Sequence, residues 1–515
     1  MMNSLTKRIM AGLLAVAMVV AGATYLSQTQ NVNFADANNN SWSGKTPKYI
    51  FLFIGDGMTY PQFTAASDYL GAVRTESKHV ESDNLTFMDF PISGTATTFD
   101  ASSFCPDSAS TATSISTGFK TLSGVINMDE TKKIGYETIA EKLKDQLGYK
   151  IGVVSSVQIN HATPAAFYAH QPSRNNYYEI GLELVGSEFD YFGGGDFISA
   201  TGKNGDQESV YALAEKNGYE IADSKEEILS LTSATEKVIA ISPVTVGGAL
   251  PYEVDRKTGE LSLADFTKKG IDVLFNEKGF FMMVEGGKID WACHANDAMA
   301  AIKDTIAFDN AVAEAVKFYN KYPNDTLILV TGDHETGGMS IGFAGTKYST
   351  YLPQLSEQEM SYEAFDEKIA SYREKNTSFA SVLMDLEIYF GLVTKANSAN
   401  TIYSNMVMSN YEYDQVKAAY ELSMTPEAER SLTEADKLMY GGYEPLSMAV
   451  THLLNNKSGI GWTSYSHTGI PAAVFARGLG SQIFSGSYDN TDIFVKLKAI
   501  TKVKPLKRLT FSWGI

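Results

Sequence analysis

Residues 49–57 read Tyr49-Ile50-Phe51-Leu52-Phe53-Ile54-Gly55-Asp56-Gly57, and this stretch decides the fold. Its first six residues are apolar without interruption, which is typical of a strand buried on both faces of a parallel sheet. Three further runs have the same character: Lys150–Val154, Gly279–Val284 and Thr326–Val330. Each follows a segment with helical periodicity: Tyr136–Leu147, Leu263–Asn276 and Ala298–Asn320. The alternation predicts an α/β fold with a large, mostly parallel central sheet and helices on both faces.

Polar residues follow each of these four strands at its end. Parallel sheets bind ligands at the carboxyl ends of their strands, so these side chains are expected at one edge. They are Asp56, His161, Thr163, Glu285, Asp290, His294, Asp333 and His334. Any one of them alone is more often a turn or cap residue, but their coincidence after four strands favours a functional site.

The types and spacings of these residues indicate metal binding. Asp290 and His294 are four apart and share one face of a helix, while Asp333 and His334 are adjacent at a strand end. Carboxylate with imidazole suits zinc, whereas an oxygen-only set drawn from Asp56, Thr163 and Glu285 suits magnesium. Two ions about 4 Å apart can act as a clamp for in-line displacement at phosphorus.

A candidate nucleophile lies in the small, polar stretch 106–113, which reads as the first turn of a helix opened by Pro106. The Ser108 hydroxyl would lie beside free backbone N–H groups, which favour an anion such as phosphate. No base stands near it in sequence, so a catalytic role requires metal supplied from elsewhere. A buried helix of small residues is the alternative. Arg174 lies just downstream of Thr163, and its planar fork could hold two phosphate oxygens.

The N-terminal segment of the chain and its net charge limit the possible functions. Lys7 and Arg8 precede an apolar run, Ile9–Val20, and small residues mark cleavage positions after Ala23 or Ala37. Residues 1–37 are therefore expected to be an export signal and linker, with an uncleaved anchor as the alternative, and the protein periplasmic or secreted. The net charge of −18 argues against nucleic-acid partners, and no later run is apolar enough to span a membrane.

Two other features of the chain need an interpretation. Residues 343–445 interrupt the α/β pattern and read as a helical insertion, with helices expected over Tyr362–Asn376, Phe379–Gly391 and Pro426–Met439. Only two cysteines are present, Cys105 and Cys293. Two unpaired buried thiols are expected, while a bridge between them or metal ligation are the alternatives.

These motifs together resemble those of alkaline phosphatases, from about Pro47 to Gly342 and again from about Gly461 to Arg477. The residues that carry the resemblance are Gly55-Asp56-Gly57-Met58, Asp107-Ser108-Ala109, His161-Ala162-Thr163-Pro164, Phe192-Gly193-Gly194-Gly195, Val284-Glu285-Gly286, Asp290 to His294, Gly332-Asp333-His334-Glu335 and Ser466-His467-Thr468-Gly469. The resemblance implies hydrolysis of phosphate monoesters by a catalytic domain over residues 47–515.

The resemblance also implies a role for each site residue. Ser108 would be the nucleophile that becomes phosphorylated, Arg174 would bind the phosphate, and Asp107 would steady Arg174. The implied cofactors are two Zn²⁺ and one Mg²⁺. Their implied ligands are Asp290, His294 and His467 for one zinc, Asp56, Asp333 and His334 for the second, and Asp56, Thr163 and Glu285 for magnesium.

Two positions vary among the proteins that this chain resembles. His161 stands where some members have aspartate, which leaves the identity of the third metal open, and Trp291 stands where some have lysine. This pair resembles the marine bacterial branch. Trp291 removes a positive charge, so weaker retention of the phosphate product is expected. The insertion resembles the crown or large loop of the family, which implies a homodimer.

Two other functions remain as alternatives. One is a phosphodiesterase of the same superfamily, although such enzymes usually offer threonine as nucleophile and lack the clamping arginine. A sulfatase needs Cys/Ser-x-Pro-x-Arg, which Cys105-Pro106-Asp107-Ser108 does not supply. The other is an exported metal- or phosphate-binding protein without catalysis. A monoester assay with and without chelator separates catalysis from binding.

Overall fold

The computed structural model of the chain describes residues 42–74, 80–504 and 508–510. The expected export signal, residues 1–37, lies outside the described residues. From Gly44 onward the chain forms a single unit built around one sheet.

The central sheet has ten strands, and nine of them run the same way. In spatial order they are β15 (Gly486–Asp489), β2 (Ile92–Thr97), β14 (Ala472–Gly478), β9 (Thr326–Gly332), β1 (Tyr49–Gly55), β8 (Phe280–Gly286), β4 (Lys150–Gln158), β5 (Tyr191–Gly195), β7 (Val238–Ile241) and β6 (Glu220–Ala222). Only β14 is antiparallel to its neighbours, β2 and β9. The four runs identified in the sequence are β1, β4, β8 and β9, which lie side by side and confirm the predicted fold.

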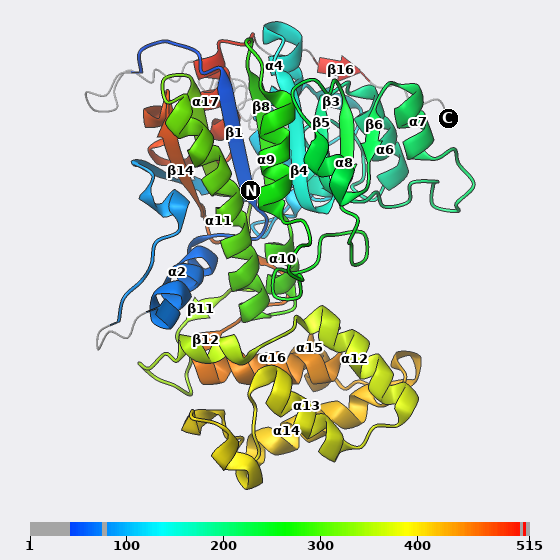
Figure 1. The fold of residues 1–515 in the computed structure, drawn as a ribbon, viewed down its shortest axis with the longest axis vertical. Helices are drawn as coiled ribbons and strands as arrows, with labels where there is room; N and C mark the ends of the chain where they lie inside the picture. The colour runs from blue at the N-terminus through cyan, green and yellow to red at the C-terminus, as the bar shows by residue number, and fades with distance from the viewer. Residues whose placement is uncertain (1–41, 75–79, 505–507, 511–515) are drawn as a thin grey trace, which may run out of the picture. The chain divides into compact units, whose positions relative to one another are not determined.

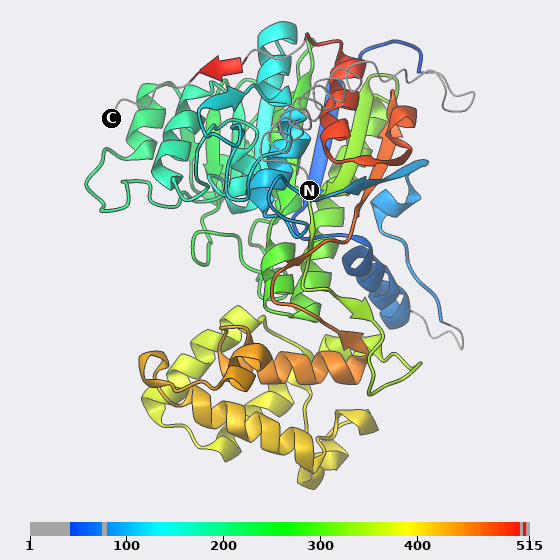
Figure 2. The same cartoon turned by 180° about the vertical axis from the view of Figure 1, so that it is seen from behind.

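Helices cover both faces of this sheet (Figures 1 and 2). On one face α9 (Leu263–Leu274) and α11 (Ala298–Lys321) pack on the central strands. On the other face lie α3 (Ser108–Thr117), α4 (Ile139–Leu147) and α17 (Thr491–Thr501). Capping boxes begin α4 at Thr138 and α9 at Ser262, and α9 starts at Leu263 as expected. The start of α4 is three residues later than the expected Tyr136, because Tyr136 ends a short strand.

Further helices and short strands connect these layers. They are α2 (Tyr60–Arg74), β3 (Ile134–Tyr136), α5 (Ala162–Ala165), α6 (Tyr177–Gly186), α7 (Val210–Lys216), α8 (Lys225–Ser230), α10 (Lys288–His294), β10 (Glu335–Thr336), β13 (His467–Thr468) and β16 (Arg508–Thr510). Of these, α10 and the β10–β13 pair carry side chains of the candidate site.

Aromatic side chains fill the core between the sheet and α11. The Phe280 ring lies edge-to-face on Phe51, with centroids 5.2 Å apart, and its centroid is 5.6 Å from that of Phe318. Phe280 is fully buried. Because this region is closely packed, the neighbouring side chains cannot move enough to fill the cavity that removal of the ring would leave.

Replacing Phe280 by alanine is therefore expected to lower the free energy of unfolding by about 3–5 kcal/mol. Denaturant titration of the metal-loaded protein measures the change. Phe104→Ala is the matched control because the Phe104 side chain is 83% exposed, and it should change the value by less than about 0.5 kcal/mol. Equal losses in the two variants would contradict the placement of Phe280 in the core.

The insertion leaves the α/β body and returns to it at one point, where β11 (Ser340–Ile341) pairs with β12 (Ile460–Gly461). Its helices are α12 (Tyr362–Lys375), α13 (Phe379–Phe390), α14 (Asn410–Ser423), α15 (Glu434–Tyr440) and α16 (Pro445–Ser458). In Figure 1 they form a separate layer beside the end of the sheet. The helical region thus continues past residue 445, as far as Ser458.

The expected helix over Pro426–Met439 forms only in its second half, as α15, and its expected start is wrong. Residues 427–429 form a single 3₁₀ turn, and the α-helix starts only after Thr433, whose side chain makes a capping box with Asp436. The preceding loop is held instead by Arg430, which donates to Glu444 and to the carbonyl oxygen of Thr425. A local cap therefore overrides the helical periodicity of the sequence.

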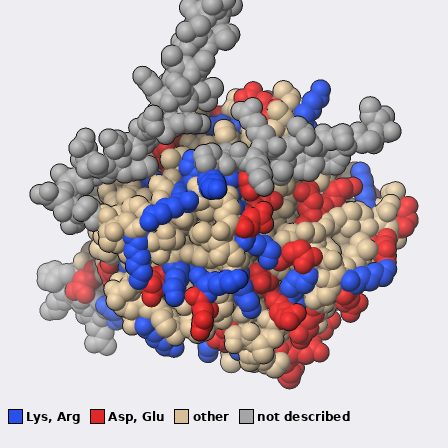
Figure 3. Space-filling view, turned by 90° about the horizontal axis from the view of Figure 1, so that it is seen from above, with Lys and Arg blue, Asp and Glu red and all other residues tan. Residues whose placement is uncertain are grey.

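The exposed charges of the protein are mixed in sign. Figure 3 shows Lys and Arg side chains interspersed with Asp and Glu on the face that it presents. Among the residues that the structure describes, no helix has both the length and the apolar character needed to cross a membrane.

Candidate functional site

Three adjacent strands end level with one another at the edge of the sheet. Gly55 of β1 pairs in register with Gly286 of β8 and Gly332 of β9. Asp56, Glu285 and Asp333 therefore meet at this edge. Gly57 then turns the chain with φ +69°, and its N–H donates to Asp333 Oδ1 at 3.2 Å. A Cβ at Gly57 would come within 2.9 Å of the Asp290 Cα, so only glycine fits this turn.

Ser108 is the first residue of α3 and lies buried beside these strand ends. Its Oγ is 3.2 Å from His334 Nε2 and 3.4 Å from Asp56 Oδ1. The helix is capped by Asp107, whose side chain accepts from the Ser110 N–H, so it begins at Ser108, two residues later than the expected start at Pro106. The helix N-terminus brings the hydroxyl to the carboxylates and imidazole that its neighbourhood in sequence lacks.

One group of potential metal ligands consists of Asp56, Asp333 and His334. One donor atom from each lies within 4.8 Å of the others, and all three side chains are buried. Burial, followed by the negative charge of Asp333, raises the pKa of Asp56 well above its usual range. Burial, with Asp290, raises the pKa of Asp333 to about 8. The positive charge of Arg174 is too weak to offset this burial for Asp56, and a bound cation would supply the remainder.

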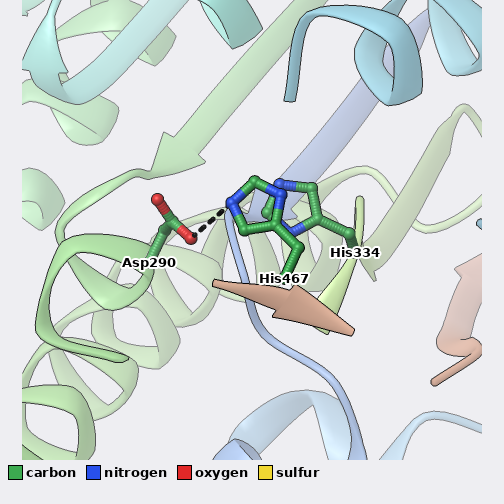
Figure 4. A group of neighbouring side chains, drawn as sticks. All are labelled: Asp290, His334 and His467. Carbon is green, nitrogen blue, oxygen red and sulfur yellow. Dashed lines mark ion pairs between the residues drawn. The ribbon is translucent and has the colours of Figure 1, made fainter. Parts of the chain in front are cut away.

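A second group contains Asp290, His334 and His467 (Figure 4). Asp290 comes from α10 and His467 from β13, and His467 Nε2 lies 3.6 Å from Asp290 Oδ1. His294, which was expected here with Asp290 and His467, lies beside them, whereas His334 was expected only in the first group. His294 Nε2 is 3.0 Å from His467 Nε2 and 3.4 Å from Asp290 Oδ2. Burial opposes ionisation of Asp290, but these three imidazoles outweigh it and hold the pKa of its carboxyl below the usual range.

Backbone carbonyls fix the orientation of two of these imidazoles. His294 Nδ1 is 2.6 Å from the Tyr465 carbonyl oxygen, and His467 Nδ1 is 2.5 Å from that of Pro106. Each Nδ1 therefore donates to its carbonyl oxygen, and the two Nε2 atoms are turned toward each other, 3.0 Å apart. Two imidazole nitrogens held in this way beside the Asp290 carboxylate form a donor set that fits a zinc-type ion.

The expected oxygen-only set consists of Asp56, Thr163 and Glu285, and the first two are in contact. Thr163 Oγ1 lies 3.4 Å from Asp56 Oδ2, and Glu285 accepts a short hydrogen bond from Ser155 on the neighbouring strand. The other carboxylate oxygen of Glu285 is buried and has no hydrogen-bond partner in the part of the chain that the structure describes. Burial raises the pKa of Glu285 to about 7. An unpaired buried oxygen in an oxygen-lined site fits a hard cation such as Mg²⁺.

Arg174 lies next to these groups and is held by Asp107. Its Nη1 donates to Asp107 Oδ2 at 2.9 Å, and its backbone N–H donates to the Gly124 carbonyl oxygen. Burial favours the neutral form of Asp107, but Arg174 and two backbone N–H groups outweigh it and lower the pKa of the carboxyl. Asp107 and Arg174 thus form an ion pair, a contact that the resemblance implied.

His161 and Trp291 lie on the same side of the site as Arg174. His161 Nε2 is 3.5 Å from Arg174 Nη2, and its ring meets Trp291 edge-to-face with centroids 5.9 Å apart. Burial, reinforced by Arg174, lowers the pKa of His161 to about 3, so the imidazole is neutral. His161 belongs to neither ligand group found among the described residues.

Sequence analysis missed several side chains that hold the ligands. Thr111 donates to Asp333 Oδ2 at 3.1 Å, and Thr336 makes a hydrogen bond to Asp290. Thr111 stands three residues after Ser108 on the same helix, so helical spacing alone could have indicated it. The carbonyl groups that orient His294 and His467 carry no signal in the sequence.

Both cysteines are free, so the alternative of a disulfide bridge between Cys105 and Cys293 is wrong. Cys293 is buried as expected, but Cys105 is exposed, which corrects the prediction of two buried thiols. Neither belongs to the ligand groups formed by the described residues.

Comparison with known proteins agrees with this geometry. The alkaline phosphatase family matches residues 47–188 and 189–503 of the chain. Alkaline phosphatase 4 of Bacillus subtilis (strain 168) is 30% identical over 488 residues, which cover 93% of each protein. The crystal structure of a cold-active alkaline phosphatase from the psychrophile Shewanella sp. matches with a TM-score of 0.72 and 28% identity, covering 88% of this chain and 99% of that one.

The Thermus thermophilus alkaline phosphatase structure shares the fold, with a TM-score of 0.72 at 22% identity, over 94% of this chain and 97% of that one. The site and the fold thus define a hydrolase of the phosphatase class. The chain belongs to the alkaline phosphatase family.

Proposed function

We propose that this protein hydrolyses phosphate monoesters in a metal-dependent reaction that passes through a phosphoserine at Ser108. The contacts of one atom carry the proposal. Ser108 Oγ lies at a helix N-terminus, 3.2 Å from His334 and 3.4 Å from Asp56, both members of a buried ligand group. A cation held by this ligand group would favour loss of the hydroxyl proton, which turns the serine oxygen into a nucleophile.

We propose two zinc ions and one magnesium ion as the cofactors. The first zinc would be held by Asp290, His294 and His467, and the second by Asp56, Asp333 and His334. Magnesium would be held by Asp56, Thr163 and Glu285. When bound, such ions lower the pKa of the serine hydroxyl and stabilise negative charge on phosphoryl oxygens.

Arg174 binds and orients the substrate in this proposal. Its Nη1 is occupied by Asp107, which leaves the remaining guanidinium N–H groups for two non-bridging phosphoryl oxygens. A monoester carries more free phosphoryl oxygens and more negative charge than a diester, so this clamp favours monoesters. The free N–H groups at the start of α3 add to the binding of the phosphoryl group.

Ser108 then attacks phosphorus opposite the leaving alcohol. The Oγ–P bond forms as the ester P–O bond breaks, and the alcohol takes up the proton that the serine gives to solvent. In the second step water attacks phosphorus, the Oγ–P bond breaks, and Ser108 regains a proton as inorganic phosphate leaves. Arg174 holds the same phosphoryl oxygens through both steps and stabilises their charge.

Trapping of the phosphoserine tests this proposal. The purified protein, loaded with zinc and magnesium, is mixed with a ³²P-labelled aryl phosphate and quenched in acid. The label is expected on the peptide that contains residues 106–113, and on Ser108 by mass spectrometry. Turnover without any label on this peptide, with label elsewhere in the chain, would contradict the assignment.

Replacing Arg174 by alanine is expected to raise KM and the inhibition constant of inorganic phosphate by about 10- to 100-fold, because two charge-assisted hydrogen bonds are lost. Arg174→Lys should recover only part of the loss, since lysine cannot form the bidentate contact. Steady-state kinetics with phosphate as inhibitor measures both constants. Arg477→Ala is the control, since this arginine packs over Phe90 and Tyr319 instead. Unchanged phosphate inhibition in Arg174→Ala would contradict the role.

Export and dimerisation complete the proposal. Lys7, Arg8 and the apolar run after them support export, and N-terminal sequencing of the mature protein tests it. The insertion exposes Met384 and Ile388 on α13, which supports self-association through this region. Light scattering of the mature protein, with Met384→Glu as the variant, tests whether a dimer forms there.

A further inference from the structure

Lys288 is a fully buried lysine next to the candidate site. It is the first residue of α10, the helix that carries Asp290, and its side chain is 0% exposed. Its Nζ lies 3.6 Å from the centroid of the Tyr252 ring and 4.8 Å from that of Trp291. Desolvation of an ammonium group is costly, so a buried lysine requires a partner that offsets its charge.

The partner of Lys288 comes from the insertion. Lys288 Nζ is 3.1 Å from Glu363 Oε2, in the first turn of α12. The start of this helix is held on the catalytic body by three contacts. The Tyr362 N–H donates to Asp297 at 2.9 Å, the Ser361 N–H donates to Asp255 at 2.9 Å, and the Tyr252 hydroxyl donates to that of Tyr362 at 3.3 Å.

Trp291 connects this ion pair to the phosphate side of the site. The Lys288 ammonium group lies on the indole, and the same side chain meets His161 edge-to-face at 5.9 Å. His161 in turn lies 3.5 Å from Arg174 Nη2. Glu363, Lys288, Trp291, His161 and Arg174 thus form one continuous series of contacts from the insertion to the phosphate-binding arginine.

We propose that Lys288, held by Glu363 of the insertion, is a positioning residue that fixes the Trp291 ring and, through it, His161 and Arg174. The insertion thereby sets the shape of the phosphate pocket. This inference rests on the proposed role of Arg174. A cation on an indole restricts the ring to one orientation, and the interaction strengthens when both groups are desolvated.

The position of the charge explains why Lys288 acts on the ring instead of on the phosphate. Glu363 neutralises the ammonium group at 3.1 Å, and Tyr252 covers it. Its net field at the phosphate is therefore small, while its contact with the indole is direct. The effect of removing it should appear in binding of substrate and product rather than in the chemical steps.

The test uses the metal-loaded enzyme and inorganic phosphate as the probe. In both Lys288→Met and Glu363→Gln, the inhibition constant of phosphate and KM for an aryl phosphate are expected to rise about three- to tenfold, with kcat changed by less than about twofold. In a Trp291→Leu background the same substitutions should have no further effect on either constant, because the ring that they hold is gone. Melting temperatures verify that each variant is folded.

Lys368→Met is the matched control. Lys368 also lies on α12, pairs with Asp385 at 3.1 Å and lies 4.6 Å from the Tyr389 ring, but all its partners belong to the insertion. Lys368→Met should change the melting temperature of the enzyme and leave its inhibition constant for phosphate unaltered. The inference is overturned if Lys288→Met and Glu363→Gln leave phosphate inhibition unchanged, or if their effects persist in full without Trp291.

Arg174→Ala, measured in parallel, separates this inference from the proposed function. If Arg174→Ala weakens phosphate binding and Lys288→Met does not, only the positioning role fails. If Arg174→Ala leaves phosphate binding unchanged, the proposed role of the arginine fails, and the positioning role that rests on it fails with it.

Discussion

Replacing Ser108 by alanine is expected to lower kcat for an aryl phosphate by about 10³- to 10⁵-fold, because the reaction loses its nucleophile. The variant should still bind phosphate, since Arg174, the N–H groups of α3 and the ligand side chains are unchanged. Its dissociation constant for inorganic phosphate, measured by isothermal titration calorimetry, should stay within about threefold of that of the parent protein. This separation of binding from turnover is specific to a residue that acts only in the chemical step.

Ser114→Ala is the control for this substitution. Ser114 lies on the same helix and is buried, but its hydroxyl donates to the Ser110 carbonyl oxygen of its own helix instead of to a site residue. Its loss should cost about 1 kcal/mol of stability and leave kcat unchanged. Full turnover by Ser108→Ala would contradict the assignment of the nucleophile.

Removal of metal is expected to lower kcat by at least about 10³-fold and to destabilise the fold. Without cations, Asp56 and Asp333 remain buried close together, and the raised pKa values of their carboxyl groups mean that folding must pay for desolvating or protonating them at neutral pH. A ligand that binds only the folded state adds about 4 kcal/mol of stability at 1,000 times its Kd. Dialysis against a chelator should therefore lower the melting temperature as well as the rate, and Zn²⁺ should restore both.

Asp333→Asn provides the comparison for metal removal. It deletes one negative charge from a ligand group, so the chelator should lower its melting temperature less than it lowers that of the parent protein. Elemental analysis before and after dialysis measures the ions that leave. Undiminished turnover by protein from which all zinc and magnesium have gone would contradict metal dependence.

The sheet and most of the ligand cluster were predictable from the sequence for one physical reason. Strands buried on both faces must be continuously apolar, so β1, β4, β8 and β9 are visible as runs, and their carboxyl ends must meet at one edge. Asp56, Glu285 and Asp333 follow directly from this rule. His467 lies beyond the insertion, and only the motif around it, known from related sequences, indicated its place.

Features that depend on tertiary contacts were not predictable in the same way. The start of α15 is decided by the Thr433 cap, which competes with helical periodicity over the preceding residues. The pairing of Lys288 with Glu363 joins residues 75 positions apart. The carbonyl groups of Tyr465 and Pro106 select the histidine tautomers, and backbone atoms leave no trace in residue identity.

The pairing of β11 with β12 has a consequence for how such enzymes diversify. Because both ends of the 342–459 excursion meet at one two-residue ladder, its length can change without shifting the register of any strand in the main sheet. The entropic cost of closing a longer excursion grows only logarithmically with its length. Natural selection can therefore enlarge, trim or replace this appendage while the chemistry persists, and under our proposal only the affinity for phosphate depends on an acidic side chain opposite Lys288.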